Sequence, residues 1–436
     1  MNSSKFEEFL NKVTSKVKSK QAHSLIKKEL THHLQELSHS FQKSDSTKEE
    51  ADEKAIEEMG NPFILGENLN HLHKPKIDWV LTSLFVIIGA ISFLPLIGTT
   101  HSLPNYHFIG RQVIWYFLAV LVIIGFLFFD YRKLRNFWMG FYVSGVGILL
   151  YTTVFGYMMN GAQRWLSIGA IIIDVTPLSL CLFFLAWAGL FSKINTFNSW
   201  PKQMIVIGLF WMPIILYMAL PHFMMSVIYF FCVVAMFAFS QVHKRLALKL
   251  VVANMIIGLG FLMTLIINFH NSYVFTRLTA FFNPHDAEFN FVVDKMRDVL
   301  SQAGWFGNGL FNDKDFFTSA HTDFAFPYLV YSLGWIFGIA LCGILLLFIL
   351  RISKNAFKTK DLYGRTLVIG GAALFAVPAC WNILMGFGIV PLMGVSLPFI
   401  SYGGSMLLCY SAILGLILSV FRQKDIIEPT IEENFN

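Results

Sequence analysis

Two apolar runs, Leu250–Phe269 (LVVANMIIGLGFLMTLIINF) and Phe324–Leu350 (FAFPYLVYSLGWIFGIALCGILLLFIL), decide the fold of this chain. Each is long enough to cross the hydrocarbon core of a bilayer as a helix, which takes about 20 residues. They flank a long polar loop, His270–Phe326, with the titratable side chains His285, Asp286, Glu288, Asp294, Lys295, Arg297, Asp298, Asp313, Lys314, Asp315, His321 and Asp323. A long polar loop in a mostly apolar chain is a favoured place for chemistry.

The composition is that of a membrane protein. Of 436 residues, 55% are hydrophobic and 14% are charged, whereas a soluble domain carries about 25% charged residues. The net charge of +6 does not predict nucleic-acid binding, because the basic residues are spread between the apolar runs. The five cysteines lie inside apolar runs with no metal-binding spacing, and we expect small core residues at Cys181, Cys232, Cys342, Cys380 and Cys409.

The apolar runs predict an all-α polytopic membrane protein, because backbone groups in lipid must be paired within helices. About ten transmembrane helices are expected, near residues 79–98, 112–129, 137–155, 177–191, 203–220, 223–240, 250–269, 324–350, 366–387 and 404–421. The long loop then joins helices seven and eight. We expect a membrane domain over 79–424 and a short cytoplasmic tail over 425–436.

Lysine and arginine predict the orientation. If the N-terminus is cytoplasmic, most basic residues fall on inner connectors, and fewer fall on outer ones, namely Arg111, Arg164, Arg277, Lys295, Arg297 and Lys314. The positive-inside rule therefore places both termini in the cytoplasm and the long loop outside the cell.

Residues 1–78 predict a small cytoplasmic helical module, interpreted as a docking or stability appendage. Apolar residues recur at helical spacing in 4–18 and 22–41. Thr47 and Glu50 have capping-box spacing, and the helix that they start is expected to end at Met59-Gly60.

Three segments fall on the predicted outer side: Gly161–Gly169 (GAQRWLSIG), the long loop with its closing His321-Thr322-Asp323-Phe324, and Pro391–Ser405 (PLMGVSLPFISYGGS). Arg164 beside Trp165 suits a lipid phosphate or pyrophosphate, which arginine binds through two parallel hydrogen bonds. Taken alone, however, an Arg-Trp pair is better interpreted as a plain interfacial anchor.

Asp323 and the third segment each allow two interpretations. A carboxylate at the boundary of a span is costly and usually functional or paired, but aspartate also caps helix N-termini. Residues Pro391–Gly404 cannot form a regular helix, which predicts a re-entrant loop lining a cavity or a tight structural turn.

Taken together, the chain from about 79 to 424 resembles the SEDS family of bacterial cell-wall proteins (shape, elongation, division and sporulation), which includes FtsW, RodA and SpoVE. The resemblance is carried by Gly161–Gly169, His321–Phe326 and Pro391–Ser405, within which Leu397–Ser405 (LPFISYGGS) is very close to the family signature. Gly304–Leu310 looks like the family's glycine-rich segment, and Asn382 matches a family asparagine.

The resemblance implies an inverting peptidoglycan glycosyltransferase that polymerises lipid II at the outer face of the bacterial cell membrane, beside a class B penicillin-binding transpeptidase. It implies that Asp323 is the general base. Candidate substrate-binding residues are Arg164, Trp165, Arg277, His321, Thr322, Asn382, Ser401 and Tyr402. A divalent metal, magnesium or manganese, could assist the departing pyrophosphate, and an apolar groove between helices would hold polyprenyl tails.

The chain departs from the family pattern at several polar positions. A family glutamate and lysine are absent at Pro177 and Leu180, and Pro221-His222-Phe223-Met224 stands where the family often has Pro-Asp-Leu-Gly. Tyr331 and Ser332 replace paired glutamates, and Phe291-Val292 replaces Tyr-Gln. From these departures we expect a divergent paralogue and not the main division or elongation enzyme. A catalytically weakened regulatory or scaffold member is the alternative, against which the retention of Asp323 argues.

Two other functions remain open: a flippase for lipid-linked precursors and a non-catalytic scaffold of a cell-wall synthesis complex. A flippase predicts charged or polar side chains along the membrane midplane, whereas the spans here are nearly free of charge. A scaffold predicts that replacing Asp323 has no effect on glycan synthesis.

Overall fold

The computed structural model describes the chain outside residues 1–3, 20–21, 44–46, 73–75, 98–106, 160–161, 170, 269–286, 311–319, 360 and 425–436. The predicted tail over 425–436 therefore lies outside the described residues. The chain divides into two compact units: Met1–Asp78 with Lys358–Asp361 and Val420–Asn436, and Trp79–Phe357 with Leu362–Ser419.

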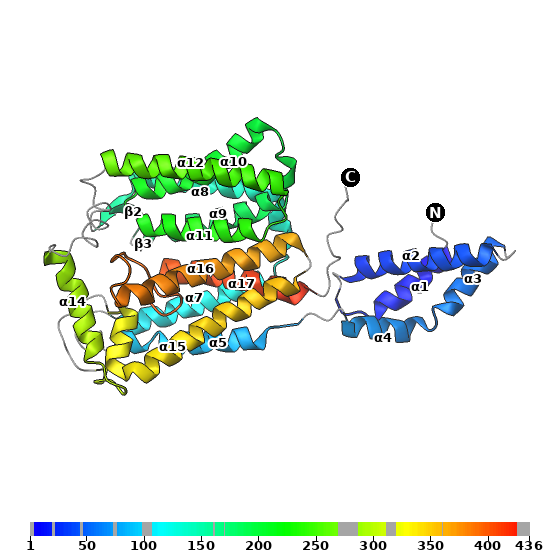
Figure 1. Ribbon diagram of the computed structural model, residues 1–436. Coiled ribbons are helices and arrows are strands. Elements are labelled where there is room, and N and C mark those ends of the chain that lie inside the picture. The colour runs from blue at the N-terminus through cyan, green and yellow to red at the C-terminus, as the bar shows by residue number, and fades with distance from the viewer. Residues whose placement is uncertain are drawn as a thin grey trace. The chain divides into compact units, whose positions relative to one another are not determined.

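Within residues 4–72, the described part of the first unit forms the helices α1 (Ser4–Ser15), α2 (His23–Gln42), α3 (Lys48–Glu58) and α4 (Pro62–Leu72) (Figure 1). Their apolar faces meet in a core that includes Phe9, Val13 and Leu34. The capping box is confirmed, because the Thr47 side chain accepts from the Glu50 N–H and the Glu50 side chain accepts from the Thr47 N–H. Helix α4 was not expected from the sequence.

The second unit is a bundle of apolar helices: α5 (Trp79–Ile91), α7 (Phe108–Phe128), α8 (Trp138–Phe155), α9 (Thr176–Phe191), α10 (Trp200–Ala219), α11 (Phe223–Ala238), α12 (Lys244–Asn268), α15 (Ala325–Lys358), α16 (Leu362–Gly386) and α17 (Gly404–Gln423). In the described part of the chain, eight helical segments are long and apolar enough to span a membrane. Helices α9 and α11, with 16 residues each, are shorter. The prediction of a polytopic, mostly helical membrane protein is confirmed.

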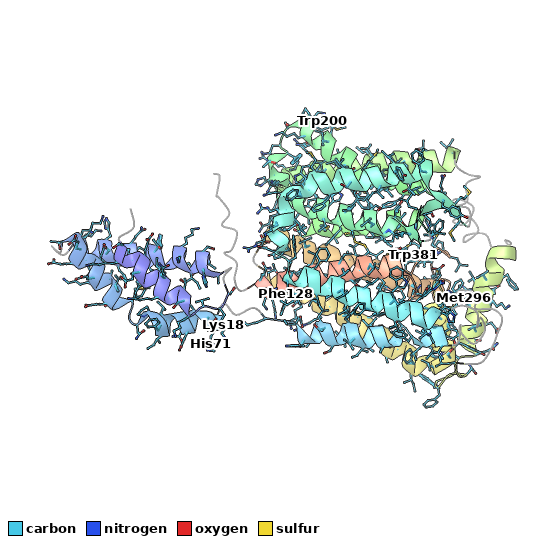
Figure 2. The ribbon with its side chains drawn as sticks, turned by 180° about the vertical axis from the view of Figure 1, so that it is seen from behind. Lys18, His71, Phe128, Trp200, Met296 and Trp381 are labelled. Carbon is cyan, nitrogen blue, oxygen red and sulfur yellow. A yellow bond between two sulfur atoms is a disulfide. The ribbon has the colours of Figure 1, made fainter. Side chains whose placement is uncertain are left out.

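Helix α9 is largely surrounded by other helices of the bundle. It packs against α8, α11 and α16, and most of its side chains are buried. The strands and helix α14 (Ala287–Ser301) gather at one end of the bundle, which we call the site end (Figure 1). Met296 of α14 lies at the site end, whereas Phe128 and Trp200 lie at the opposite end (Figure 2).

A small antiparallel sheet, not expected from the sequence, precedes α9. Its strands are β1 (Tyr157–Met159), β2 (Ala162–Ile168) and β3 (Ile171–Asp174), in the order β1-β2-β3. The motif Gly161–Gly169 therefore supplies β2. The expected long polar loop is also partly helical, because α14 forms within it and buries Val293, Met296 and Val299.

The glycine-rich segment is fastened to a break in α15. Gly334 has φ +86° and ψ 172°, which divides α15 into two helical segments. Around this break, backbone N–H groups pair with carbonyls: Asn308 with Tyr331 at 3.0 Å, Gly309 with Ser332 at 2.9 Å, and Trp335 with Gly304 at 3.0 Å. A Cβ at Gly307 or Gly334 would overlap the facing backbone, so this close approach requires glycine.

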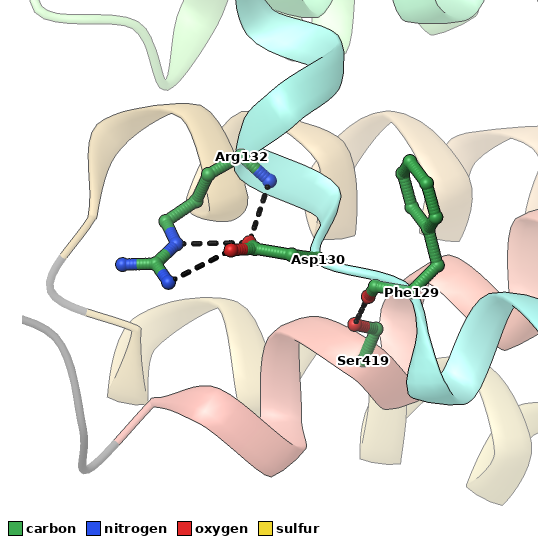
Figure 3. Close-up of polar contacts among 4 residues, drawn as sticks. All are labelled: Phe129, Asp130, Arg132 and Ser419. Carbon is green, nitrogen blue, oxygen red and sulfur yellow. Dashed lines mark hydrogen bonds and ion pairs between the residues drawn. The ribbon is translucent and has the colours of Figure 1, made fainter. Parts of the chain in front are cut away.

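At the opposite end of the bundle, local hydrogen bonds fix the turn after α7 (Figure 3). Asp130 accepts from the Arg132 N–H at 3.2 Å and from its Nε at 2.9 Å, at the start of the 3-10 helix η2 (Tyr131–Phe137). Partial burial alone would raise the pKa of Asp130, but the hydrogen bonds and charge of Arg132 outweigh it and lower the pKa. The Ser419 hydroxyl donates to the Phe129 carbonyl at 2.7 Å. A second 3-10 helix, η3 (Ile194–Thr196), follows α9.

The cysteine prediction was wrong for two residues. Cys181 of α9 and Cys409 of α17 form a disulfide with a Cα–Cα distance of 6.4 Å. Their separation of 228 residues hid a pairing that only the packing of α9 against α17 reveals. Cys232, Cys342 and Cys380 are free.

Candidate functional site

Asp323 lies at the site end, directly before α15. The Phe324 carbonyl accepts the N–H of Tyr328 at 3.1 Å, so helical bonding starts one residue after the aspartate. The Asp323 side chain is half-buried and faces Gly394, where an added Cβ would stand 3.7 Å from Oδ2. Gly394 is exposed in an otherwise mostly buried segment. The carboxylate is therefore reachable at a point where the neighbouring backbone carries no side chain.

The segment from Pro391 to Gly403 is not helical and is mostly buried, as its composition predicted. With α16, it holds the motif through three consecutive carbonyls: His321 accepts from the Tyr402 N–H at 2.7 Å, Thr322 from the Ser401 hydroxyl at 2.6 Å, and Asp323 from the Asn382 amide at 2.9 Å. The same Asn382 amide donates to the Val395 carbonyl at 2.8 Å. The structure thus brings together six of the predicted site residues.

His321 lies against two aromatic rings. Its ring centroid is 4.7 Å from that of Phe108 and 5.8 Å from that of Tyr402. Burial lowers the pKa of His321, so the imidazole is neutral near pH 7. Its Nδ1 is buried without a hydrogen-bond partner among the described residues. Phe108, which sequence reasoning missed, therefore forms one wall of the site from α7.

Arg164 and Trp165 belong to a second group, built on the sheet. The guanidinium carbon of Arg164 lies 4.6 Å from the centroid of the Trp165 ring. Arg164 Nε is 3.4 Å from Asp174 Oδ2, and both side chains are largely buried, at 26% and 21% exposure. The cation is therefore paired with a specific acid, through an ion pair in which Arg164 Nε makes no hydrogen bond among the described residues.

His222 lies in the turn between α10 and α11 and is buried. Burial and the nearby charge of Arg164 lower its pKa well below the ordinary value. The Ser179 hydroxyl of α9 and the Tyr217 hydroxyl of α10 are 2.8 Å apart. Sequence reasoning recorded His222 only as a departure from the family. The signal that could have found it is its place between two spans on the same predicted face as Arg164.

The remaining acids and cations of the long loop are either not described or lie on α14. Arg277 and Asp286 lie outside the described residues, and the side chain of Glu288 is not described. Asp294 and Asp298 are exposed on α14, where Asp294 lies 3.8 Å from Arg297 and Asp298 accepts from Gln302 at 2.9 Å. Both are engaged locally on their own helix.

A metal site made by the protein alone is not present among the described residues. No group of three or more His, Cys, Asp or Glu side chains there is arranged to hold an ion. Magnesium keeps several waters and is commonly bound by one or two carboxylates together with substrate phosphates.

An apolar cavity of about 480 Å³ opens between α9, α10, α11 and α12. Aromatic and aliphatic side chains dominate its lining, among them Trp187, Phe210, Phe230, Met255 and Leu259. The polar contact within it is local, because Trp211 Nε1 donates to Asn254 Oδ1 at 2.9 Å. This cavity has the chemistry of the expected groove for hydrocarbon tails.

Comparison with known proteins gives concordant matches. The model of a family described as cell cycle protein, that of FtsW, RodA and SpoVE, matches residues 75–426. An Aliivibrio salmonicida protein named probable peptidoglycan glycosyltransferase FtsW is 25% identical over 402 residues, covering 84% of this chain and 98% of that protein. A Coxiella burnetii protein of the same name is 29% identical over 288 residues, covering 63% of this chain and 74% of its own length.

Solved structures share the fold. A chain from a peptidoglycan synthase complex, solved in work on the coordination of polymerization and crosslinking, aligns with a TM-score of 0.67 at 22% identity, covering 80% of this chain and 98% of that one. Thermus thermophilus rod shape determining protein RodA aligns with a TM-score of 0.58 at 22% identity, over 80% of this chain and 97% of that protein.

Proposed function

The chain belongs to the FtsW/RodA/SpoVE family, and from this premise we propose that it is a peptidoglycan glycosyltransferase that polymerises lipid II. The observation that carries the proposal is the support of Asp323. The backbone carbonyls of residues 321, 322 and 323 are each fixed by a hydrogen bond from α16 or from the segment before α17. A carboxylate held by such rigid surroundings is preorganised for proton transfer.

In the proposed reaction, Asp323 accepts the proton of an acceptor sugar hydroxyl. The hydroxyl oxygen forms a bond to the anomeric carbon of the donor from the side opposite the leaving group. The bond from that carbon to the pyrophosphate oxygen breaks, and the pyrophosphate leaves with the electron pair attached to its polyprenyl chain. A positioned general base typically contributes about 10²–10⁴-fold to such a step.

The other site residues have supporting roles in this proposal. Arg164, backed by Trp165, binds the pyrophosphate, since arginine matches phosphate oxygens through two parallel bonds. Asn382 and Ser401 hold the backbone of the motif, and His321 with Thr322 and Tyr402 shapes the acceptor side. Arg277 remains a proposed second cation. A magnesium or manganese ion, when bound, would add positive charge beside the departing pyrophosphate.

The setting follows from the same proposal. The protein is a multi-pass membrane protein, and we place it in the bacterial cell membrane, with both termini cytoplasmic and the site end outside, because basic residues concentrate on the other side. A similar fold occurs in a peptidoglycan synthase complex. We therefore propose a class B penicillin-binding transpeptidase as its partner, membrane lipid as its solvent, and no nucleic-acid ligand.

The test is polymerisation of labelled lipid II by the purified full-length protein in detergent or nanodiscs. The assay is run alone and with the candidate transpeptidase, with magnesium, manganese or a chelator. Glycan chains that lengthen with time are the expected result. If no chains form in any arm while the protein remains folded, the enzyme proposal is wrong. Translocation of lipid II across vesicles would then favour the flippase, and its absence the scaffold.

A further inference from the structure

The backbone and side chain of Arg164 are both tied to the end of β3. Strands β2 and β3 pair in a register that sets Trp165 opposite Asp174. The N–H of Val175 donates to the Arg164 carbonyl at 3.4 Å, while Arg164 Nε lies 3.4 Å from Asp174 Oδ2. Val175 therefore fixes the backbone of Arg164, and Asp174, the last residue of β3, fixes the position of its guanidinium.

The Asp174 carboxylate is itself held in place. Its Oδ1 accepts from the N–H of Thr176 at 2.9 Å and from the Thr176 hydroxyl at 2.7 Å. Thr176 is the first residue of α9, so Asp174 is anchored on the N-terminus of the central helix. One oxygen faces the helix and the other faces Arg164, which leaves the carboxylate little freedom to turn.

The surroundings of Arg164 favour a single, oriented cation. Trp165 covers the guanidinium at 4.6 Å, and the side chain is 26% exposed, so part of it remains reachable. His222 is buried nearby and is kept neutral by burial and by the charge of Arg164. Between Arg164 and His222, the arginine thus carries the positive charge, and contact with Asp174 through Nε leaves its terminal nitrogens to meet another anion.

We infer that Asp174 is a positioning residue for substrate: it holds the Arg164 guanidinium in the orientation that receives the pyrophosphate of a lipid-linked donor. The inference rests on the proposed function for the identity of the ligand. A flexible arginine loses side-chain entropy when it binds, and an arginine already fixed by Asp174 and Trp165 loses less. The carboxylate acts through Arg164 and does not touch the reacting atoms.

The experiment measures binding of farnesyl pyrophosphate, with farnesol as the uncharged probe, to the purified full-length protein in detergent. No turnover is needed. The variants are Asp174→Asn, Asp174→Glu, Thr176→Val, Arg164→Ala and the Arg164→Ala/Asp174→Asn double variant. Asp130→Asn is the matched control, because Asp130 also precedes a helix and pairs with an arginine, Arg132, but at the opposite end of the bundle.

We expect Asp174→Asn to weaken binding of farnesyl pyrophosphate about tenfold and to leave farnesol binding unchanged. Asp174→Glu should restore part of the loss. Thr176→Val keeps the charge of Asp174 and the backbone hydrogen bond to it but removes the hydroxyl hydrogen bond, so it should give a smaller loss. The double variant should bind no more weakly than Arg164→Ala, because Asp174 acts only through the arginine. Asp130→Asn should match the wild type.

Three results overturn the inference: Asp174→Asn binds as tightly as or more tightly than the wild type, the two losses add in the double variant, or the wild type does not distinguish farnesyl pyrophosphate from farnesol. If Asp174→Asn does not fold, Thr176→Val and Asp174→Glu carry the test. Suppose that farnesyl pyrophosphate binding depends on Asp174 as expected but the wild type makes no glycan. That result rejects the proposed polymerase and leaves this inference standing.

Discussion

The hydroxyl of Ser401 donates a hydrogen bond of 2.6 Å to the backbone carbonyl of Thr322, across 79 residues of sequence. The same hydroxyl accepts the N–H of Leu397 at 2.8 Å. One buried side chain therefore joins the turn before α17 to the turn that presents Asp323. The serine of the signature LPFISYGGS has a structural task that also places the proposed base.

Replacing Ser401 with alanine should reduce both stability and glycan synthesis. The buried N–H of Leu397 loses this hydrogen bond, which costs about 1–3 kcal/mol, and the loss of the bond to the Thr322 carbonyl loosens the turn at Asp323. Ser411→Ala is the matched control, since the buried Ser411 hydroxyl bonds only within its own helix, to the Leu407 carbonyl at 2.8 Å. Thermal melting and lipid II polymerisation measure the effect. Equal behaviour of the two variants would refute this role of Ser401.

Gly334→Ala should disrupt the fold around the break in α15. Gly334 has φ +86°, and an added Cβ would overlap the backbone of Trp305 and Gly307; strained backbone of this kind costs about 1–3 kcal/mol before the clash is counted. Gly343→Ala, later in the same helix and with open space around its Cβ, should be neutral or slightly stabilising. The yield of folded protein and the melting temperature compare them. A well-folded Gly334→Ala variant would show that the break needs no glycine.

The Cys181–Cys409 disulfide ties α9, whose first residue Thr176 donates its N–H to Asp174, to α17, which follows the Ser401 segment. Reducing it, or replacing both cysteines with serine, should lower the free energy of unfolding by about 2–4 kcal/mol. Thiol alkylation followed by mass spectrometry checks the pairing. Cys181 and Cys409 should be protected until a reductant is added, whereas alkylation of both without reductant would contradict the disulfide.

The burial of His222 should make the stability of the protein depend on pH. Its pKa is lowered by burial and by Arg164, so the unfolded chain binds a proton more readily than the folded one. The stabilisation is present above the ordinary histidine pKa of about 6.5 and is lost as the pH falls below it. His321, with a pKa lowered by burial, acts in the same direction.

We therefore expect the melting temperature to fall between pH 7 and pH 5, and His222→Asn to flatten part of that slope. His243→Asn, at an exposed position in the same unit, should keep the slope of the wild type. Differential scanning fluorimetry in detergent across this range measures it. Identical slopes in the wild type and His222→Asn would show that His222 does not contribute.

The sequence predicted the helices well, because each apolar run carries its own signal of length and hydropathy. It also predicted that Pro391–Gly404 is not a helix and that Thr47 and Glu50 cap α3, since both follow from local chemistry. It missed the small sheet and α14, which are short and lie outside the spans. Such elements depend on packing more than on any long periodic pattern.

The site was predicted as a set of residues but not as a set of contacts. Asn382 and Asp323 are 59 residues apart, and their hydrogen bond uses a backbone carbonyl that no motif displays. Asp174 was not singled out from the sequence, because its contact with Arg164 depends on the register of β2 and β3. The Cys181–Cys409 pair was also missed, because its two cysteines are 228 residues apart in the sequence.

The central claim is that Asp323 is the base of a glycosyltransferase, and Asp323→Asn tests it most directly. The measurement is the initial rate of lipid II polymerisation by the purified variant beside the wild type. Asp294→Asn, which removes an exposed carboxylate of α14, is the control. With all three proteins folded by thermal melting, the account predicts that Asp323→Asn is at least about 10²-fold slower, while Asp294→Asn keeps the wild-type rate. An Asp323→Asn protein that polymerises lipid II at the wild-type rate would contradict the account.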